Sequence, residues 1–311
     1  MIHTDIQRFL KDWDAAWASL PAGTGPAGRR AHFEVVAAGM REPTPPGIVT
    51  QEHWVDVAET GAQVRVRVFR PEAATGLLPA LVYLHGGAWM QGSPETHWDI
   101  TAGIAGLNQQ IVISVDYALS PENPFPRALH ETAAVVRWAH DQAAALGIRA
   151  DAIAIGGDSA GGNLAATASL VLRGTPHAPK AQLLVYPATD FTTERASHRE
   201  NANGPLVTVA SMPAVNAMYC PNPADLLNPL AAPLRAESHA SLPPAFIAVA
   251  EHDPLRDEGI AYAEALQAAG VNVQLDRGES LIHGYLRAKS YCAPARQRFE
   301  EMAAWLKATL A

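Results

Sequence analysis

The chain has few cysteines, and those it has are far apart. Its 311 residues contain only Cys220 and Cys292. Neither has the close spacing that zinc ligands or a redox pair require. We therefore expect two free thiols that fill ordinary positions in a helix and a loop, with no metal site and no bound cofactor.

The chain also lacks an excess of basic charge and any long apolar run. Lys and Arg total 23 against 31 Asp and Glu, a net charge of −8, which excludes a nucleic-acid partner and favours neutral or apolar ligands. No apolar run is long enough for a membrane-spanning helix. Because charges begin at Asp5, Arg8 and Lys11, the apolar region of a signal peptide does not fit, and we expect a cytoplasmic protein.

What the chain does have is an alternation of short apolar runs with longer stretches of helical spacing. The alternating residues 64–69 (VRVRVF) predict an exposed-edge antiparallel strand. Solid apolar runs predict strands buried on both faces at 80–84, 111–115, 153–155, 183–186 and 246–250. Helical spacing predicts helices over 128–146, 162–172, 258–269 and 295–310. The chain is therefore predicted to be an α/β protein, with a mostly parallel central sheet flanked by helices on both faces.

Two regions depart from this alternation. Residues 1–50 combine an amphipathic start with the Pro-rich stretch EPTPPG, and residues 191–234 are polar and Pro-rich, with one helix expected around 209–219. A long insertion between sheet strands usually has a function, most often as a cover over a site. We therefore predict a helical cap formed by 1–50 and 191–234, over a core formed by 51–190 and 235–311.

The most specific motif is GDSAG at residues 157–161. It follows the apolar run 153–155 directly and precedes an Ala-rich helix, which is the strand–turn–helix setting of a nucleophilic serine. The sharp turn should strain the backbone of Ser159 and expose its hydroxyl, while the flanking glycines avoid clashes. We predict that Ser159 is a nucleophile.

A nucleophilic serine needs donors for the negative charge that develops on the substrate oxygen. The sequence HGGAW at 85–89 follows the run 80–84 and is nearly free of side chains, so its amides can face a substrate carbonyl. We predict an oxyanion hole formed by the N–H groups of Gly86, Gly87 and Ala160. His85 is predicted to hold the loop rather than carry protons.

The general base and its acid partner are expected later in the chain, if the order is Ser, acid, His. His283 lies in IHGY at 282–285, in a loop at the carboxyl edge of the sheet, and is the favoured base among 12 histidines. Asp253 follows the run 246–250 and is the favoured acid. Asp257, which suits an N-cap for the helix 258–269, and Glu251 are the alternatives.

Taken together, these motifs resemble the bacterial hormone-sensitive-lipase-like (family IV) carboxylesterases of the α/β-hydrolase superfamily. The resemblance lies in HGGAW (85–89), GDSAGG (157–162), EHDPLRDE (251–258) and IHGY (282–285), supported by DYALSPENPFP (116–126) and YPATD (186–190). It covers the chain from about residue 50 to the end. The family often has HGGG, and Ala88 here takes the place of the last glycine.

The resemblance implies an α/β-hydrolase fold with a helical cap and a Ser159–His283–Asp253 triad that hydrolyses short- to medium-chain acyl esters through an acyl-enzyme. It also implies a small-molecule ester as partner, no cofactor, and a homodimer through the last strand and its helix. A non-catalytic receptor is the alternative class, but such proteins usually lack a triad member. Thioesters, lactones and activated amides stay open as further substrates.

Overall fold

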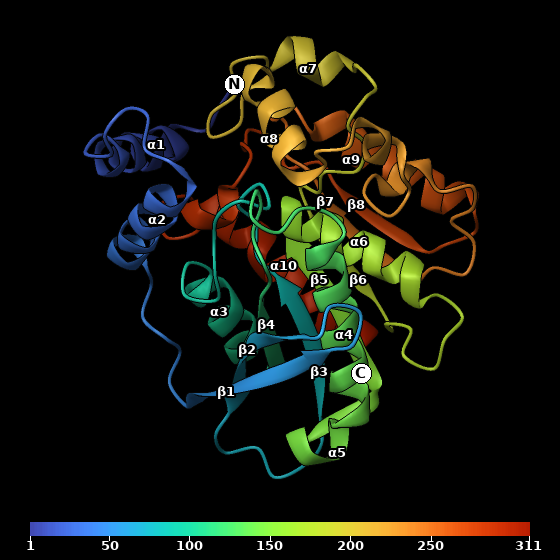
Figure 1. The fold of residues 1–311 in the computed structure, drawn as a ribbon. Helices are drawn as coiled ribbons and strands as arrows, with labels where there is room; N and C mark the ends of the chain where they lie inside the picture. The colour runs from blue at the N-terminus through green and yellow to red at the C-terminus, as the bar shows by residue number, and fades with distance from the viewer.

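The computed structural model describes all 311 residues and contains one eight-stranded sheet (Figure 1). Strands β1 and β2 are antiparallel to their neighbours, and β3 to β8 run parallel to one another. The predicted α/β fold with a mostly parallel sheet is confirmed. In spatial order the strands are β1 (Ile48–Val57), β2 (Ala62–Pro71), β4 (Ile111–Asp116), β3 (Leu78–Leu84), β5 (Ile148–Asp158), β6 (Gln182–Val185), β7 (Ala245–Ala248) and β8 (Val273–Asp276).

The prediction for the antiparallel edge was half right. β2 is antiparallel, but it is not the edge strand, because β1 pairs with it along its whole length from Ile48↔Pro71 to Val57↔Ala62. β1 was not predicted, since its sequence IVTQEHWVDV mixes polar and apolar residues without a solid run. The short β8 at the opposite edge was missed for the same reason.

Helices cover both faces of the sheet, and the side chains of β3 show the division. Val82 belongs to the apolar cluster under α4 (Arg127–Asp141), α5 (Ala143–Leu146), α6 (Ala160–Leu172) and α9 (Arg256–Ala268). Its neighbour Tyr83 points to the other face, in the cluster with α3 (Trp98–Asn108) and α10 (Ala293–Thr309). The members of both clusters are buried, which holds the strand ends that carry the candidate site.

The segments predicted to form a cap fold into short helices at one end of the molecule. Figure 1 shows α1, α2, α7 and α8 at the upper end, and α5 at the lower end. The last residues of the segment 1–50 belong to β1. The helices are α1 (Thr4–Trp17), α2 (Pro26–Met40), α7 (Ala196–Glu200) and α8 (Met212–Tyr219), with 3₁₀ turns η1 (Val209–Ser211), η2 (Pro223–Leu227), η3 (Pro233–Arg235) and, near the carboxyl end, η4 (Tyr285–Ala288).

Both cysteines are buried and free, as expected. Cys220 ends α8 and Cys292 precedes α10. None of the helices combines the length and the apolarity that crossing a membrane would require.

Candidate active site

Ser159 stands at the turn between β5 and α6. Its φ of 55° lies in the left-handed region, so the expected strain is present. A Cβ atom on Gly157 or Gly161 would overlap the carbonyl oxygen of Leu84 at the end of β3. The turn therefore needs glycine on both sides of the serine. The Ser159 N–H donates to Val185 O (2.8 Å), which ties the turn to β6.

Three side chains from separate parts of the chain meet at this turn. His283 Nε2 lies 2.9 Å from Ser159 Oγ, and His283 Nδ1 lies 2.7 Å from Asp253 Oδ2. Asp253 and His283 are buried. Their loops are held together by a parallel bridge between His252 and Ile282. The sequence predicted this juxtaposition, although 30 positions separate the acid from the histidine and 124 separate the histidine from the serine.

The two alternative acids lie in other contacts. Asp257 Oδ2 accepts a hydrogen bond from Ser197 N (2.8 Å) on α7, and Glu251 Oε2 accepts one from Ser280 N (2.7 Å). The prediction that Asp257 is an N-cap is wrong. α9 begins at Arg256 after Leu255, so Asp257 lies in its first turn, where a negative charge also favours the helix.

The oxyanion loop differs from the prediction at Gly86. The Gly86 N–H donates to Asp158 Oδ1 (3.0 Å) and also lies 3.2 Å from His97 Nε2. Its amide is therefore occupied within the protein. No internal partner binds the N–H groups of Gly87 and Ala88, which line the cavity beside Ser159. Ala160 is the first residue of α6, so its N–H has no acceptor within the helix.

Asp158 anchors this loop from beneath. Its Oδ1 also accepts the hydroxyl of Tyr83 (2.8 Å). Burial acts to raise the pKa of Asp158, but His97, the Arg287 guanidinium and the Tyr83 hydroxyl together hold it well below its usual range. The carboxylate therefore stays ionised and keeps the Gly86 amide. This role of Asp158 could not be predicted from the motif, because Asp158 occupies the variable position of the serine motif.

His85 has the structural place that was predicted. Its ring is buried, stacks on Tyr117 at 4.2 Å and contacts Gly86 O through Nδ1 (3.0 Å). Burial lowers the pKa of His85 to about 3, so the ring is neutral at physiological pH.

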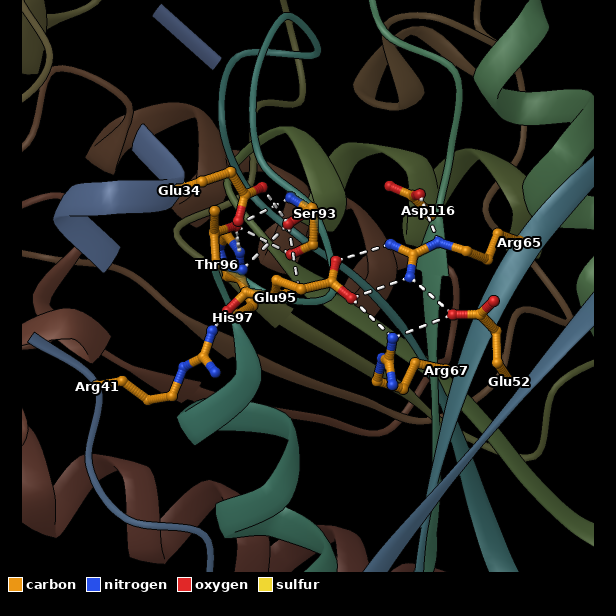
Figure 2. A network of polar contacts seen from close by, with 10 residues as sticks. All are labelled: Glu34, Arg41, Glu52, Arg65, Arg67, Ser93, Glu95, Thr96, His97 and Asp116. Atoms are coloured by element: carbon orange, nitrogen blue, oxygen red, sulfur yellow. Dashed lines mark hydrogen bonds and ion pairs between the residues drawn. The ribbon is translucent and has the colours of Figure 1, made fainter. Parts of the chain in front are cut away.

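A network of ion pairs braces the segment between the oxyanion loop and α3 (Figure 2). Glu95 receives both terminal nitrogens of Arg65 (2.9 and 2.7 Å) and Arg67 Nη2 (3.0 Å) from β2. Arg65 also pairs with Glu52 and Asp116. On the same segment, Figure 2 shows Ser93 beside Glu34 of α2. The Ser93 hydroxyl donates a hydrogen bond to the Glu34 carboxylate (2.5 Å). The network thus joins β2, α2 and the loop after Gly87.

Two cavities reach Ser159. The larger, of about 540 Å³, opens between the N-terminal helices and the oxyanion loop, and its walls include Trp13, Trp17 and Phe33. The smaller, of about 250 Å³, is mostly apolar and lies under α8, with Met212 and Val215 in its wall. The residues that border both cavities are Arg29, Ala88, Gln91, Ser159, Leu206 and Val207.

Possible metal ligands gather elsewhere. His3, Asp5 and Cys292 place ligand atoms within 4.8 Å of one another, where the start of α1 meets the start of α10. None of the three lines either cavity at Ser159.

Comparison with known proteins shows the family to which the chain belongs. A family model described as the alpha/beta hydrolase fold matches residues 81–287. The carboxylesterase NlhH of Mycobacterium tuberculosis is 38% identical over 262 residues, covering 81% of this chain and 82% of that protein. The chain is a member of the hormone-sensitive-lipase-like carboxylesterases of the α/β-hydrolase superfamily. The family and fold predicted from the sequence are therefore confirmed, as is the class of enzyme, a carboxylic ester hydrolase.

Further relatives agree. An ethyl acetate hydrolase of Pseudomonas putida is 36% identical over 234 residues, covering 74% of each protein. The structure of a hyperthermophilic esterase from the archaeon Pyrobaculum calidifontis superposes with a TM-score of 0.91 at 32% identity, covering 100% of this chain and 99% of the other. The similarity thus extends through the N-terminal helices and the segment 191–234.

Proposed function

We propose that this carboxylesterase uses Ser159 as nucleophile, His283 as general base and acid, and Asp253 to orient the imidazole. The observation that carries the proposal is the chain of two short contacts, 2.9 Å from Ser159 Oγ to His283 Nε2 and 2.7 Å from His283 Nδ1 to Asp253 Oδ2. With its proton on Nδ1, His283 donates to Asp253 and accepts the serine hydroxyl on Nε2. All three groups are aligned before any substrate arrives.

The reaction then follows from this arrangement. Ser159 Oγ attacks the ester carbonyl as His283 Nε2 takes its proton, and Asp253 stabilises the imidazolium. The C–O bond to the alcohol breaks, and the alcohol leaves with the proton from His283. Water then attacks the acyl-enzyme in the same way, giving its proton to His283, which returns it to Ser159 as the acid departs.

The substrate oxygen is proposed to sit among the N–H groups of Gly87, Ala88 and Ala160. Gly86 is left out of this set because its N–H serves Asp158. Ala88 replaces it because a backbone N–H needs no side chain, so a methyl group in the fourth position of the HGGA loop keeps the donor. Ala160 contributes at the positive end of α6, where the helix dipole favours an anion.

The two cavities suggest how an ester is oriented. We propose that the acyl arm enters the smaller, apolar cavity under α8 and that the alcohol arm lies in the larger cavity beside α1 and α2. The segments 1–50 and 191–234 then act as a cap, because they supply one wall of each cavity. A space of about 250 Å³ suits short and medium acyl chains and excludes the long chains of triglycerides.

The test is hydrolysis of p-nitrophenyl esters with acyl chains of two to sixteen carbons. We expect kcat/KM to be highest among the short and medium chains and to fall steeply for the longest. A maximum at sixteen carbons would contradict the placement of the acyl arm, and binding of the esters without release of p-nitrophenol would favour the receptor alternative. The homodimer through β8 and α10 also stays a proposal, which sedimentation equilibrium of the purified chain tests.

A further inference from the structure

Two arginine side chains line the cavities at Ser159, and they differ in what they bind. Arg287 donates to Thr96 O (3.1 Å) and to His97 Nε2 (2.8 Å) and packs over the ring of Phe33, so its donors are used within the protein. Arg29 forms neither an ion pair nor a side-chain hydrogen bond, although it is half-buried. It lines both cavities.

The neighbouring Arg30 shows that α2 can satisfy an arginine where the structure requires it. Arg30 donates to Met90 O and Ser120 O, each at 2.7 Å, and pairs with Glu122. Arg29 differs in that its guanidinium lies over the ring of Trp17, 5.3 Å from the centroid. Stacking on an aromatic face holds the guanidinium plane in one orientation and leaves the N–H donors at its edge free.

The carboxylates around the smaller cavity are already bound. Asp190 pairs with Arg235 (2.9 Å) and Arg195 (3.6 Å), and the buried Glu258 accepts Thr189 N (2.8 Å). Burial raises the pKa of Glu258 well above its usual range, which favours its neutral form. Arg29 is therefore the one charge on this wall that lacks a partner.

The larger cavity is less favourable for an anion. It also holds the exposed Asp14 of α1, which would repel a negative group beside Arg29. An anionic group that enters with the acyl arm meets Arg29 without meeting an unpaired carboxylate. The net charge of −8 opposes anions at long range, but screening beyond about 8 Å at physiological ionic strength leaves the local contact to decide.

We propose that Arg29 binds a carboxylate on the acyl arm of the substrate, so that the enzyme prefers monoesters of dicarboxylic acids to neutral esters of the same shape. This proposal rests on the proposed function, since it assumes that Ser159 attacks the ester carbonyl. The carboxylate accepts two parallel hydrogen bonds from the N–H groups of the guanidinium. A neutral apolar end group accepts neither.

The experiment compares two ethyl esters by titrating the acid released. Ethyl hydrogen glutarate carries the carboxylate, and ethyl 5-methylhexanoate replaces it with an isopropyl group of similar shape. Arg29→Gln should lower kcat/KM for the glutarate about tenfold and leave the neutral ester within about twofold, because a hydrogen bond to a charged group is lost. Arg29→Lys keeps the charge but not the forked pair of donors. Its kcat/KM for the glutarate should lie between the values of the wild type and Arg29→Gln.

Arg8→Gln is the matched control. Arg8 also stacks on an aromatic ring, Tyr291 at 5.3 Å, and lies on α1, but it lines neither cavity. Arg8→Gln changes the net charge by the same amount as Arg29→Gln and should leave kcat/KM unchanged for both esters. Equal losses on both esters in Arg29→Gln would mean that Arg29 only supports the cap, and no loss on the glutarate would remove its role. Either outcome overturns the proposal.

Two further arms separate the assumptions. The acetate ester of 4-hydroxybutanoate, compared with 4-methylpentyl acetate, places the carboxylate on the alcohol arm. If Arg29→Gln lowers kcat/KM for the acetate ester of 4-hydroxybutanoate but not for the glutarate, the carboxylate is bound on the alcohol arm, and the acyl-arm assignment is contradicted. If the wild-type enzyme hydrolyses neither the charged nor the neutral esters, the proposed function fails rather than the role of Arg29.

Discussion

Replacing Glu95 with Gln removes the negative charge at the centre of the ion-pair network beside the oxyanion loop. Glutamine keeps the length and shape of the side chain, so the change tests charge and hydrogen bonding rather than packing. Glu95 is bound by three guanidinium nitrogens, and the side chains of Arg65 and Glu95 are only 18% and 29% exposed. Such a pair is partly shielded from water, unlike an ordinary surface pair.

The magnitude follows from this intermediate burial. Exposed pairs contribute about 0–1 kcal/mol, and breaking a fully buried pair costs about 3–5 kcal/mol. After allowance for solvent screening, Glu95→Gln should lower the free energy of unfolding by about 1–2 kcal/mol. In a chain of this size that corresponds to a fall in Tm of about 1.5–3 °C, measured by calorimetry at pH 7.

The effect should depend on pH in a definite direction. Burial acts to raise the pKa of Glu95, but the hydrogen bonds and charge of Arg65 lower it to about 2, below its value in the unfolded chain. A lowered folded-state pKa contributes stability above the unfolded pKa, which is lost as the pH falls through the folded pKa. The difference in stability between wild type and Glu95→Gln should therefore be constant above about pH 5 and shrink below about pH 4.

The matched control is Glu194→Gln. Glu194 pairs with Arg199 at 3.0 Å, but the two side chains are 70% and 68% exposed, so its removal should not change Tm measurably. The reasoning is refuted if the two variants lose the same stability, or if the loss in Glu95→Gln is unchanged in acid.

Two further predictions concern the site. Asp158→Ala removes the acceptor that holds the Gly86 N–H, so the oxyanion donors lose their fixed positions. It should lower kcat about 10²-fold with a smaller change in KM. Asp158→Asn keeps an acceptor oxygen and should lower kcat less. Steady-state kinetics with a circular-dichroism check of folding tests this, and an unchanged kcat in Asp158→Ala contradicts it. Met212→Trp fills part of the smaller cavity and should move the acyl-chain optimum to shorter chains, measured with the p-nitrophenyl series; an unchanged profile would place the acyl arm in the larger cavity.

The sequence predicted the parts of the fold that depend on strong local signals. The solid runs that became β3 to β7 and the GDSAG motif require no tertiary information, because buried strands and a glycine-flanked turn each leave a pattern in the residues. β1 left none, since polar residues interrupt its apolar ones and Trp54 is exposed. α3 was also missed, because its sequence WDITAGIAGLN is apolar nearly all round and has no clear helical stripe.

The candidate site shows the same limit. The sequence indicated that Ser159, Asp253 and His283 come together, because Ser159 and Asp253 each follow a predicted strand and the order Ser, acid, His puts the base after both. It could not indicate that the amide of Gly86 turns toward Asp158, since that depends on a carboxylate 72 positions away. Nor could it single out Arg29, because only the fold shows that this side chain lines both cavities and has no ion-pair partner.

The most direct test of the central claim is the rate of p-nitrophenyl butyrate hydrolysis by wild type and Ser159→Ala under identical conditions. If Ser159 is the nucleophile, kcat/KM should fall by about 10⁴ or more, while the variant keeps the melting temperature of the wild type. A variant that retains the activity of the wild type would contradict the assignment of Ser159 and the mechanism derived from it.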